Sequence, residues 1–234
     1  MLKDKFISVV IPALNEENAI GDVIRDLPMW IDQIIVSDNG SNDNTAAVAE
    51  QLGAQVVFEL EPGYGSACLK GLSAVDQRVD VIAFIDGDYS DFPEDIHKIV
   101  DPIVAGEADF VLASRAKGLV QKGALTPAQK FGNWLATWLM RRIWAAPYSD
   151  LGPFRAIDAA LLERLAMEDR NYGWTIEMQI KAVLAGARIL EVPARYRQRI
   201  GVSKISGTIS GSVKAGYKIL HTIWKYRKLE RPQM

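Results

Sequence analysis

The chain has 234 residues, of which 49% are hydrophobic and 24% are charged, with a formal net charge of -2 and one cysteine. These values exclude a disordered chain, a disulfide framework and a cysteine-based zinc site, and they give no overall attraction to nucleic acid, so we predict no nucleic-acid partner. No run reaches the roughly 18 apolar residues of a membrane-spanning helix. No signal-peptide pattern is present, and we expect a cytoplasmic protein.

Short apolar runs rich in β-branched residues alternate with helical patterns through the first half of the chain. The predicted strands are 6–11, 33–36, 54–60, 81–85 and 109–114, and the predicted helices are 18–27, 43–52, 65–76 and 94–105. Strands that are apolar on both faces suit a parallel sheet covered on both sides. The alternation predicts an α/β fold, with a single open, mostly parallel sheet and helices on both faces.

The pattern changes after residue 115. We predict a Trp-rich helix over 127–144, a helix near 173–185, a strand over 188–192, a basic loop and a long terminal helix. The sequence has no internal repeat and no low-complexity linker. We therefore expect a single domain, 1–234, whose parts are residues 1–115, 116–208 and 209–234.

Polar clusters follow the first four predicted strands. They read PALNEEN, SDNGSNDNT, EPGYGSA and DGDYSDFP. In open α/β sheets, ligands bind in the crevice beyond the carboxyl ends of the strands. The four loops therefore predict a ligand site at one edge of the sheet.

Asp86 and Asp88 stand two residues apart at the end of a buried strand. Residues i and i+2 of an extended backbone point the same way, so both carboxylates can face the crevice. Mg²⁺ usually takes one or two carboxylates plus substrate phosphates, and Mn²⁺ accepts similar ligands. A calcium-binding loop is excluded, because Asp91 replaces its glycine and His97 its glutamate. A plain turn is the alternative, and we predict that Asp91 caps the helix that begins near Pro93.

The other loops carry weaker patterns. Asp38 can accept a hydrogen bond from a base or ribose, although a turn with an Asx cap explains its neighbours equally well. Asn15 and Glu16 stand where a helix start can approach a phosphate or nucleoside. The stretch GYGSACLKG is neither a phosphate loop nor a dinucleotide fingerprint, because Cys68 replaces the last glycine. It predicts a helix start that needs close backbone approach.

Taken together, eight motifs in order resemble the family 2 glycosyltransferases with the GT-A fold, nearest to the polyprenyl- or dolichyl-phosphate mannose and glucose synthases. The resemblance covers residues 6 to about 208, through PALNEEN, SDNGSNDNT, GYGSA, DGDYSDFPEDI, ASR, DLGPFRAI, GWTIEMQIKA and RYRQRIGVSK. It implies inverting transfer of a hexose from a nucleotide sugar, with a nucleotide-binding half at 1–115 and an acceptor half at 116–208.

The same resemblance implies roles for individual residues. Asp86 and Asp88 would be the Asp-x-Asp motif that binds Mg²⁺ or Mn²⁺. The residues implied for the nucleotide are Pro12, Ala13, Asn15, Glu16, Asp38, Gly65 and Asp86. Two positions depart from the family, Asn39 where a second aspartate is common and Leu14 where an aromatic residue is common. Both leave UDP and GDP open as the donor nucleotide.

The acceptor decides which further residues are needed. A hydroxyl acceptor needs a general base, for which Glu177 and Asp150 are candidates, although Glu177 can instead pair with Lys181 on a helix surface. A lipid phosphate, with a second pKa of about 6, needs cations instead. The candidates for holding it are Ser114, Arg115, Arg195, Arg197, Arg199, Ser203 and Lys204. A basic strand edge that resists aggregation is the alternative for the arginines.

Two amphipathic helices suggest a partner surface. The terminal helix alternates an apolar face with a basic one, and the helix at 127–144 carries Phe131, Trp134 and Trp138 beside two arginines. Such helices suit the inner face of an anionic membrane, although packing on the core or in a homo-oligomer also explains them.

We therefore expect a hexosyltransferase acting on a polyprenyl or dolichyl phosphate. Transfer to a soluble or glycan hydroxyl is the alternative. A non-catalytic nucleotide-sugar-binding subunit is a further one. Nucleotidyl transfer is disfavoured, because the first loop, PALNEEN, is not glycine-rich.

Overall fold

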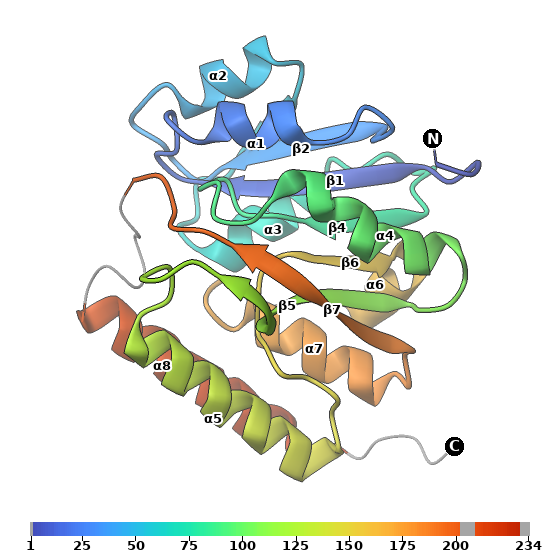
Figure 1. Ribbon diagram of the computed structural model, residues 1–234, viewed down its shortest axis with the longest axis vertical. Helices are drawn as coiled ribbons and strands as arrows, with labels where there is room; N and C mark the ends of the chain where they lie inside the picture. The colour runs from blue at the N-terminus through green and yellow to red at the C-terminus, as the bar shows by residue number, and fades with distance from the viewer. Residues whose placement is uncertain (1, 202–208, 230–234) are drawn as a thin grey trace.

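The computed structural model describes residues 2–201 and 209–229, and Figure 1 shows their arrangement around one sheet. The strands are β1 (Ile7–Ala13), β2 (Gln33–Asp38), β3 (Gln55–Phe58), β4 (Val81–Phe84), β5 (Phe110–Val120), β6 (Arg155–Asp158) and β7 (Ile189–Tyr196). The helices are α1 (Ile20–Asp26), α2 (Thr45–Gln51), α3 (Tyr64–Leu72), the 3-10 turn η1 (Pro93–Ile96), α4 (His97–Val104), α5 (Pro127–Trp144), α6 (Ala159–Leu165), α7 (Trp174–Leu184) and α8 (Ile209–Tyr226).

The seven strands form one sheet in the order β3-β2-β1-β4-β6-β5-β7. β1 pairs in parallel with β2 and β4, and only β6 runs antiparallel to its neighbours, β4 and β5. The predicted fold class is confirmed. Because β1, β2 and β4 are parallel neighbours, the loops that follow them meet at one edge of the sheet.

The strand β6 and the helix α6 were not predicted. The segment 155–158 has only four residues and no periodic pattern, and it becomes a strand because β4 and β5 pair with it on both sides. Asp158 ends the strand and caps α6, since its carboxylate accepts a hydrogen bond from the backbone N–H of Leu161 (2.9 Å). By contrast, α5 matches its predicted bounds. Thr126 and Gln129 form a capping box at its start, and Pro127 occupies the first turn.

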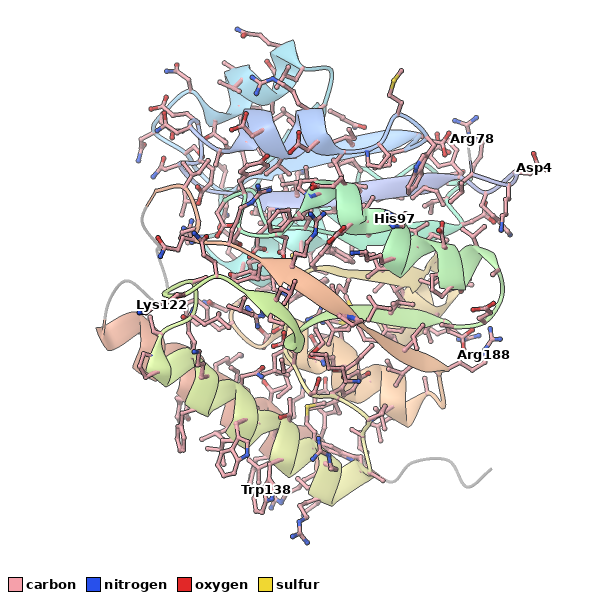
Figure 2. All side chains as sticks on the ribbon, in the orientation of Figure 1. Asp4, Arg78, His97, Lys122, Trp138 and Arg188 are labelled. Carbon is pink, nitrogen blue, oxygen red and sulfur yellow. The ribbon has the colours of Figure 1, made fainter. Side chains whose placement is uncertain are left out.

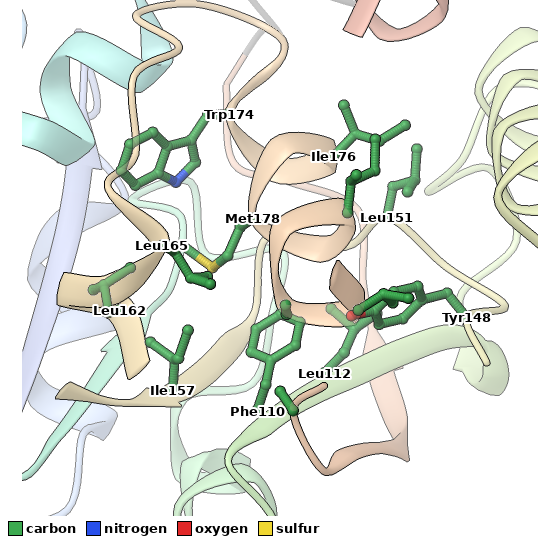
Figure 3. Packing of buried hydrophobic residues seen from close by; sticks show 14 of the residues in the cluster. Phe110, Leu112, Tyr148, Leu151, Ile157, Leu162, Leu165, Trp174, Ile176 and Met178 are labelled. Atoms are coloured by element: carbon green, nitrogen blue, oxygen red, sulfur yellow. The ribbon is translucent and has the colours of Figure 1, made fainter. Parts of the chain in front are cut away.

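Helices cover both faces of the sheet and enclose a separate hydrophobic core on each. One core lies under α1, α2 and α4, and the other under α3 and α5 to α8. Figure 3 shows the second core, in which Phe110 of β5 packs near Tyr148, with ring centroids 6.3 Å apart. Within the described residues, no helix combines the length and apolarity needed to cross a membrane.

We expect Phe110→Ala to lower the free energy of unfolding by about 3–5 kcal/mol, because it leaves a cavity in this core. Phe131→Ala is the matched control, since Phe131 is 61% exposed and Phe110 is fully buried. Urea denaturation measures both, and the control should change by less than about 0.5 kcal/mol. Equal losses for the two variants would contradict the assignment of Phe110 to the core.

Candidate active site

A cleft of about 350 Å³ lies at the carboxyl ends of β1, β2 and β4. Its lining includes six residues predicted from the sequence, Pro12, Ala13, Glu16, Asp86, Asp88 and Arg199. The other lining residues are Leu14, Asn39, Pro62, Gly63, Tyr64, Ala67, Gly87, Asn171 and Tyr172. The four predicted polar loops and the basic loop therefore meet in one place, and Tyr64 and Ala67 add the start of α3.

Asp86 and Asp88 both line the cleft, as their spacing predicts. The carboxylate of Asp86 accepts a hydrogen bond from the Tyr64 hydroxyl (3.0 Å), and that of Asp88 from the backbone N–H of Ser90 (2.9 Å). Burial, and then the neighbouring charge of Asp88, raise the pKa of Asp86 from 3.8 to about 7. A raised pKa means that the ionised pair is costly unless a cation joins it.

Arg199 supplies a positive charge at this pair. Its guanidinium Nη1 lies 3.0 Å from the carboxylate of Asp88, and its Nη2 donates to the carboxylate of Glu16. The arginine predicted to hold phosphate therefore contacts a predicted metal ligand. Ser203 and Lys204, predicted to act beside it, lie outside the described residues.

The other two alternating arginines hold the acidic loop itself. Arg195 pairs with Asp95 (2.7 Å), and Arg197 lies 3.5 Å above the Tyr89 ring while it donates to the Tyr89 carbonyl (2.8 Å). Neither is among the described residues that line the cleft. The three arginines thus have different roles, because two of them fasten loop 86–95 to β7 and only Arg199 reaches the carboxylate pair.

The prediction that Asp91 caps a helix is wrong. Phe92 precedes η1 as its N-cap, without a side-chain hydrogen bond, and Asp91 instead forms an antiparallel bridge with Tyr196 of β7. The pairing draws Asp91 into the interior, where it is 2% exposed and its Oδ2 has no partner among the described residues. Burial, and then the charge of Asp86, hold the pKa of Asp91 well above its usual range.

Asp38 and Asn15 shape the loops beside the cleft. The Asp38 carboxylate accepts hydrogen bonds from the backbone N–H groups of Gly40 (2.9 Å) and Ser41 (2.7 Å). The Asn15 side chain accepts one from the backbone N–H of Asn42 (2.7 Å). The turn weighed as the alternative for Asp38 is therefore present, and direct nucleotide contact by either residue stays a prediction.

The predicted close backbone approach is confirmed at the GYG turn, which comprises residues 63–65 and is approached by the loop at 168–172. A Cβ atom at Gly65 would lie 2.0 Å from the carbonyl oxygen of Asp169, and the backbone N–H of Ser66 donates to the carbonyl of Arg170 (2.9 Å). Gly65 itself is buried beneath this contact. Glycine is required there by the loop at 168–172, and a nucleotide role for Gly65 stays a prediction.

Ser114, Arg115 and Asp150 belong to two hydrogen-bonded groups, Arg115 with Asp150 and Ser114 with Ser149. Arg115 grips the Asp150 carboxylate with two guanidinium nitrogens, each at 2.8 Å. The Ser114 hydroxyl lies 2.8 Å from the Ser149 hydroxyl, which donates in turn to Glu191 (2.7 Å). Each of these three side chains has a partner within the protein, and all three are absent from the described lining of the cleft.

Glu177 lies on α7 and is 1% exposed. Its carboxylate accepts hydrogen bonds from the backbone N–H of Asp169 (2.8 Å) and the hydroxyl of Tyr226 (3.0 Å), and it pairs with Lys181 (2.9 Å). The pair with Lys181 is therefore present, but buried and not on the helix surface. The structure brings Glu177 to α8 and the loop at 168–172, and it does not line the cleft within the described residues.

Four of the lining residues that sequence reasoning missed have polar side chains, and they are Asn39, Tyr64, Asn171 and Tyr172. Asn39 was noted only as a departure from the family, although its amide joins β2 to the loop after β3 by donating to the carbonyl of Glu61 (2.8 Å). Tyr64 stands inside the quoted motif GYGSA, so its hydroxyl was a signal that could have been used. Asn171 and Tyr172 carry no local signal, because only the packing of the 168–172 loop on the GYG turn brings them to the cleft.

Comparisons with known proteins find glycosyltransferases among the similar sequences. An uncharacterized glycosyltransferase of Mycobacterium tuberculosis is 36% identical over 211 residues, which cover 89% of this chain and 94% of that protein. A dolichyl-phosphate hexose transferase of Haloferax volcanii is 32% identical over 214 residues, covering 88% of this chain and 89% of the relative.

Solved structures agree as well. Glucosyl-3-phosphoglycerate synthase of M. tuberculosis, crystallised with Mn²⁺, UDP-glucose and phosphoglyceric acid, shares the fold, with a TM-score of 0.75 and 24% identity over 97% of this chain and 81% of that one. The model of Glycosyl transferase family 2 matches residues 8–165, more than half of the sequence, and the chain belongs to that glycosyltransferase family.

Proposed function

We propose that this glycosyltransferase moves a hexose, with inversion, from a UDP or GDP sugar to a polyprenyl or dolichyl phosphate, with Mg²⁺ or Mn²⁺ as its cofactor. The observation that carries the proposal is the pair Asp86 and Asp88 in the cleft, with one arginine on it. The cleft at the strand ends holds the donor, and Arg199 stands at the end where a diphosphate would lie.

The residues present fit a divalent ion. Two carboxylates supply hard oxygen ligands, and Mg²⁺ or Mn²⁺ would complete its shell with diphosphate oxygens and water. The cationic group of Arg199 already lies 3.0 Å from Asp88, which marks the position as one that favours positive charge. A bound ion would neutralise charge that develops on the departing diphosphate. Arg199 would then bind the phosphates themselves through its two-pronged geometry.

A phosphate acceptor is supported by the state of the two candidate bases. Asp150 accepts hydrogen bonds from the guanidinium of Arg115. Glu177 pairs with Lys181 and accepts hydrogen bonds from the Tyr226 hydroxyl and a backbone amide. An acceptor that is already anionic needs no base, since a phosphate monoester has a second pKa of about 6. The name of the Haloferax volcanii relative supports the same acceptor class.

A hydroxyl acceptor remains the second candidate, and Asp91 favours it. This buried carboxyl is three residues from Asp88, and its Oδ2 has no partner among the described residues. If it opened to the cleft, it would supply the base that a hydroxyl requires.

We further propose that α5 and α8 lie on an anionic membrane surface. The two helices pack side by side in Figure 1, and each leaves aromatic side chains exposed, Trp134 by 57% and Trp224 by 61%. Trp138 points outward from the molecule in Figure 2, with the Arg142 guanidinium 5.6 Å from its ring centroid. Exposed aromatics beside cations match the interface of an anionic bilayer.

Asp88→Asn should lower turnover by about 100-fold or more, because it removes an ion ligand that contributes several kcal/mol to the transition state. The assay measures nucleoside diphosphate released from UDP- and GDP-hexoses in the presence of a polyprenyl phosphate and Mn²⁺. Asp76→Asn is the matched control, since Asp76 pairs with Arg78 on the surface.

Full turnover by Asp88→Asn in the presence of a chelator would overturn the metal assignment. Transfer by the wild-type protein to a sugar hydroxyl, with none to the polyprenyl phosphate, would overturn the acceptor. Tight donor binding with no transfer to either would leave a nucleotide-sugar-binding subunit.

Affinity for Mg²⁺ should rise with pH up to about 7 and then level. The pKa of Asp86 is raised to about 7, so the neutral carboxyl is favoured in the fold, and the stability it contributes is lost as pH rises through that value. Below pH 7 the ion must displace this proton, which weakens binding by up to about tenfold per pH unit. Calorimetry in two buffers of different ionisation enthalpy should detect the released proton, and Asp86→Asn should abolish the release. Mg²⁺ binding that is flat from about pH 5.5 to 8 would contradict the prediction.

The double variant Trp134→Ser/Trp138→Ser should bind anionic phosphatidylglycerol vesicles about tenfold more weakly than the wild type, because each exposed indole contributes interfacial burial. Co-sedimentation with vesicles measures the effect, with neutral phosphatidylcholine vesicles for comparison. Phe58→Ser is the control, since Phe58 is 58% exposed on β3, at the opposite edge of the sheet from β7. Concentration-dependent dimers without vesicle binding would assign the surface to a homo-oligomer instead.

A further inference from the structure

We propose that the loop at 168–172 is a wall of the donor site and that α8 fixes its position, with Asp169 and Lys218 as positioning residues. The inference rests on the proposed function, since it takes the cleft as the site of the nucleotide sugar. The carboxylates of Asp169 and Glu177 would hold this loop in place.

The loop contributes directly to the cleft. Asn171 and Tyr172 line it together with Tyr64 and the residues at the strand ends. Besides Arg199, they are the only described lining residues from the second half of the chain. Any donor that fills the cleft therefore contacts this loop as well as the loops after β1, β2 and β4.

The loop is seated on the GYG turn with little freedom. The Arg170 carbonyl accepts from the backbone N–H of Ser66 (2.9 Å), and the Arg170 side chain pairs with Glu61 (2.9 Å). A Cβ atom at Gly63 would lie 2.1 Å from the same carbonyl oxygen. Backbone contact therefore fixes the loop at Arg170. The two residues that line the cleft, Asn171 and Tyr172, must be positioned by other contacts.

Asp169 supplies such contacts from inside the loop. One oxygen of its carboxylate accepts hydrogen bonds from the backbone N–H groups of Asn171 (2.8 Å) and Gly173 (3.1 Å). These bonds fold the tip back on itself and orient Asn171 and Tyr172. Such local bonds from an aspartate are a common way to fix a turn.

The second carboxylate oxygen of Asp169 faces α8. Lys218 of α8 donates to it from 2.9 Å, with 9% of the Asp169 side chain exposed and 37% of that of Lys218. Two helical turns further along, the hydroxyl of Tyr226 donates to Glu177 (3.0 Å), which also accepts the backbone N–H of Asp169 (2.8 Å). Positions eight apart lie on the same side of a helix, so one face of α8 holds the loop at two points.

A second lysine on α8 provides a natural comparison. Lys225 pairs with Glu168 at 3.1 Å, but both side chains are well exposed, by 50% and 65%. Exposed pairs contribute little, whereas a pair with a nearly buried member loses a satisfied charge when its partner is removed. Only the Lys218 pair should therefore matter to the cleft.

The test compares Lys218→Met with Lys225→Met, which remove the same charge from the same helix. We expect Lys218→Met to weaken binding of UDP or GDP in the presence of Mn²⁺ by about tenfold, to raise KM for the donor sugar in proportion, and to change kcat by less than about twofold, because uniform binding is lost. Lys225→Met should bind as the wild type does. Calorimetry with Mg²⁺ alone should give the same affinity for all three proteins, since the carboxylate pair is untouched.

A double-mutant cycle ties the effect to the wall. Tyr172→Ala should weaken nucleotide binding. Lys218→Met should then weaken binding by a smaller factor in the Tyr172→Ala background than in the wild type, because both substitutions act on the same contact between the loop and the nucleotide. Tyr226→Phe removes only the hydroxyl that Glu177 accepts, and a severalfold loss in that variant supports the second anchor if Lys218→Met fails to fold.

Three outcomes would overturn the inference: wild-type nucleotide affinity in both Lys218→Met and Tyr226→Phe, equal losses in the two lysine variants, or full additivity in the cycle. A wild-type protein that binds Mg²⁺ but neither UDP nor GDP would instead refute the proposed function.

Discussion

The structure is organised around two carboxylates that a fold would not ordinarily place together. Asp86 and Asp88 follow a strand that is buried on both faces, and burial together with the neighbouring charge of Asp88 raises the pKa of Asp86 to about 7. Water cannot fully solvate them there, so neighbouring groups must. Tyr64 donates to one carboxylate, and Arg199 brings its charge to the other. The pKa of Asp86 is raised even with these partners in place, so the site favours a further positive charge such as a divalent ion.

Neighbouring positive charges hold the acidic loop in this arrangement. Arg195 and Arg197 direct their positive charge to the far side of the acidic loop, to Asp95 and to the ring and carbonyl of Tyr89. These contacts join the loop to β7 and to Arg197, the residue that follows that strand. Of the three arginines, only Arg199 lines the cleft within the described residues, where it pairs with Glu16 and Asp88.

The buried acids of the second half are used differently. Asp150 and Glu177 accept hydrogen bonds from an arginine, a lysine, a tyrosine and backbone amides, so their charges are satisfied within the protein. The oxygens of both carboxylates are therefore occupied by partners within the protein. This engagement and the exposed aromatic side chains of α5 and α8 are the features on which the proposed lipid-phosphate acceptor rests.

Sequence patterns alone predict the fold class, nearly every strand and helix of the first half, and the convergence of Pro12, Glu16, Asp86 and Asp88. These follow from hydrophobic periodicity and from the rule that polar loops of a parallel sheet meet at its carboxyl edge, and both are local or topological signals.

The partner that each charged side chain takes depends on how distant parts of the chain fold together. β6 forms because two strands pair with it, and Asp91 is buried because it bridges to β7. Glu177 links α7 to α8, because it accepts hydrogen bonds from the hydroxyl of Tyr226 and the backbone N–H of Asp169. A carboxylate looks the same in a sequence whether it will bind a metal, a proton or a neighbouring helix. Its role depends on burial and on partners far away along the chain, and only folding brings these to it.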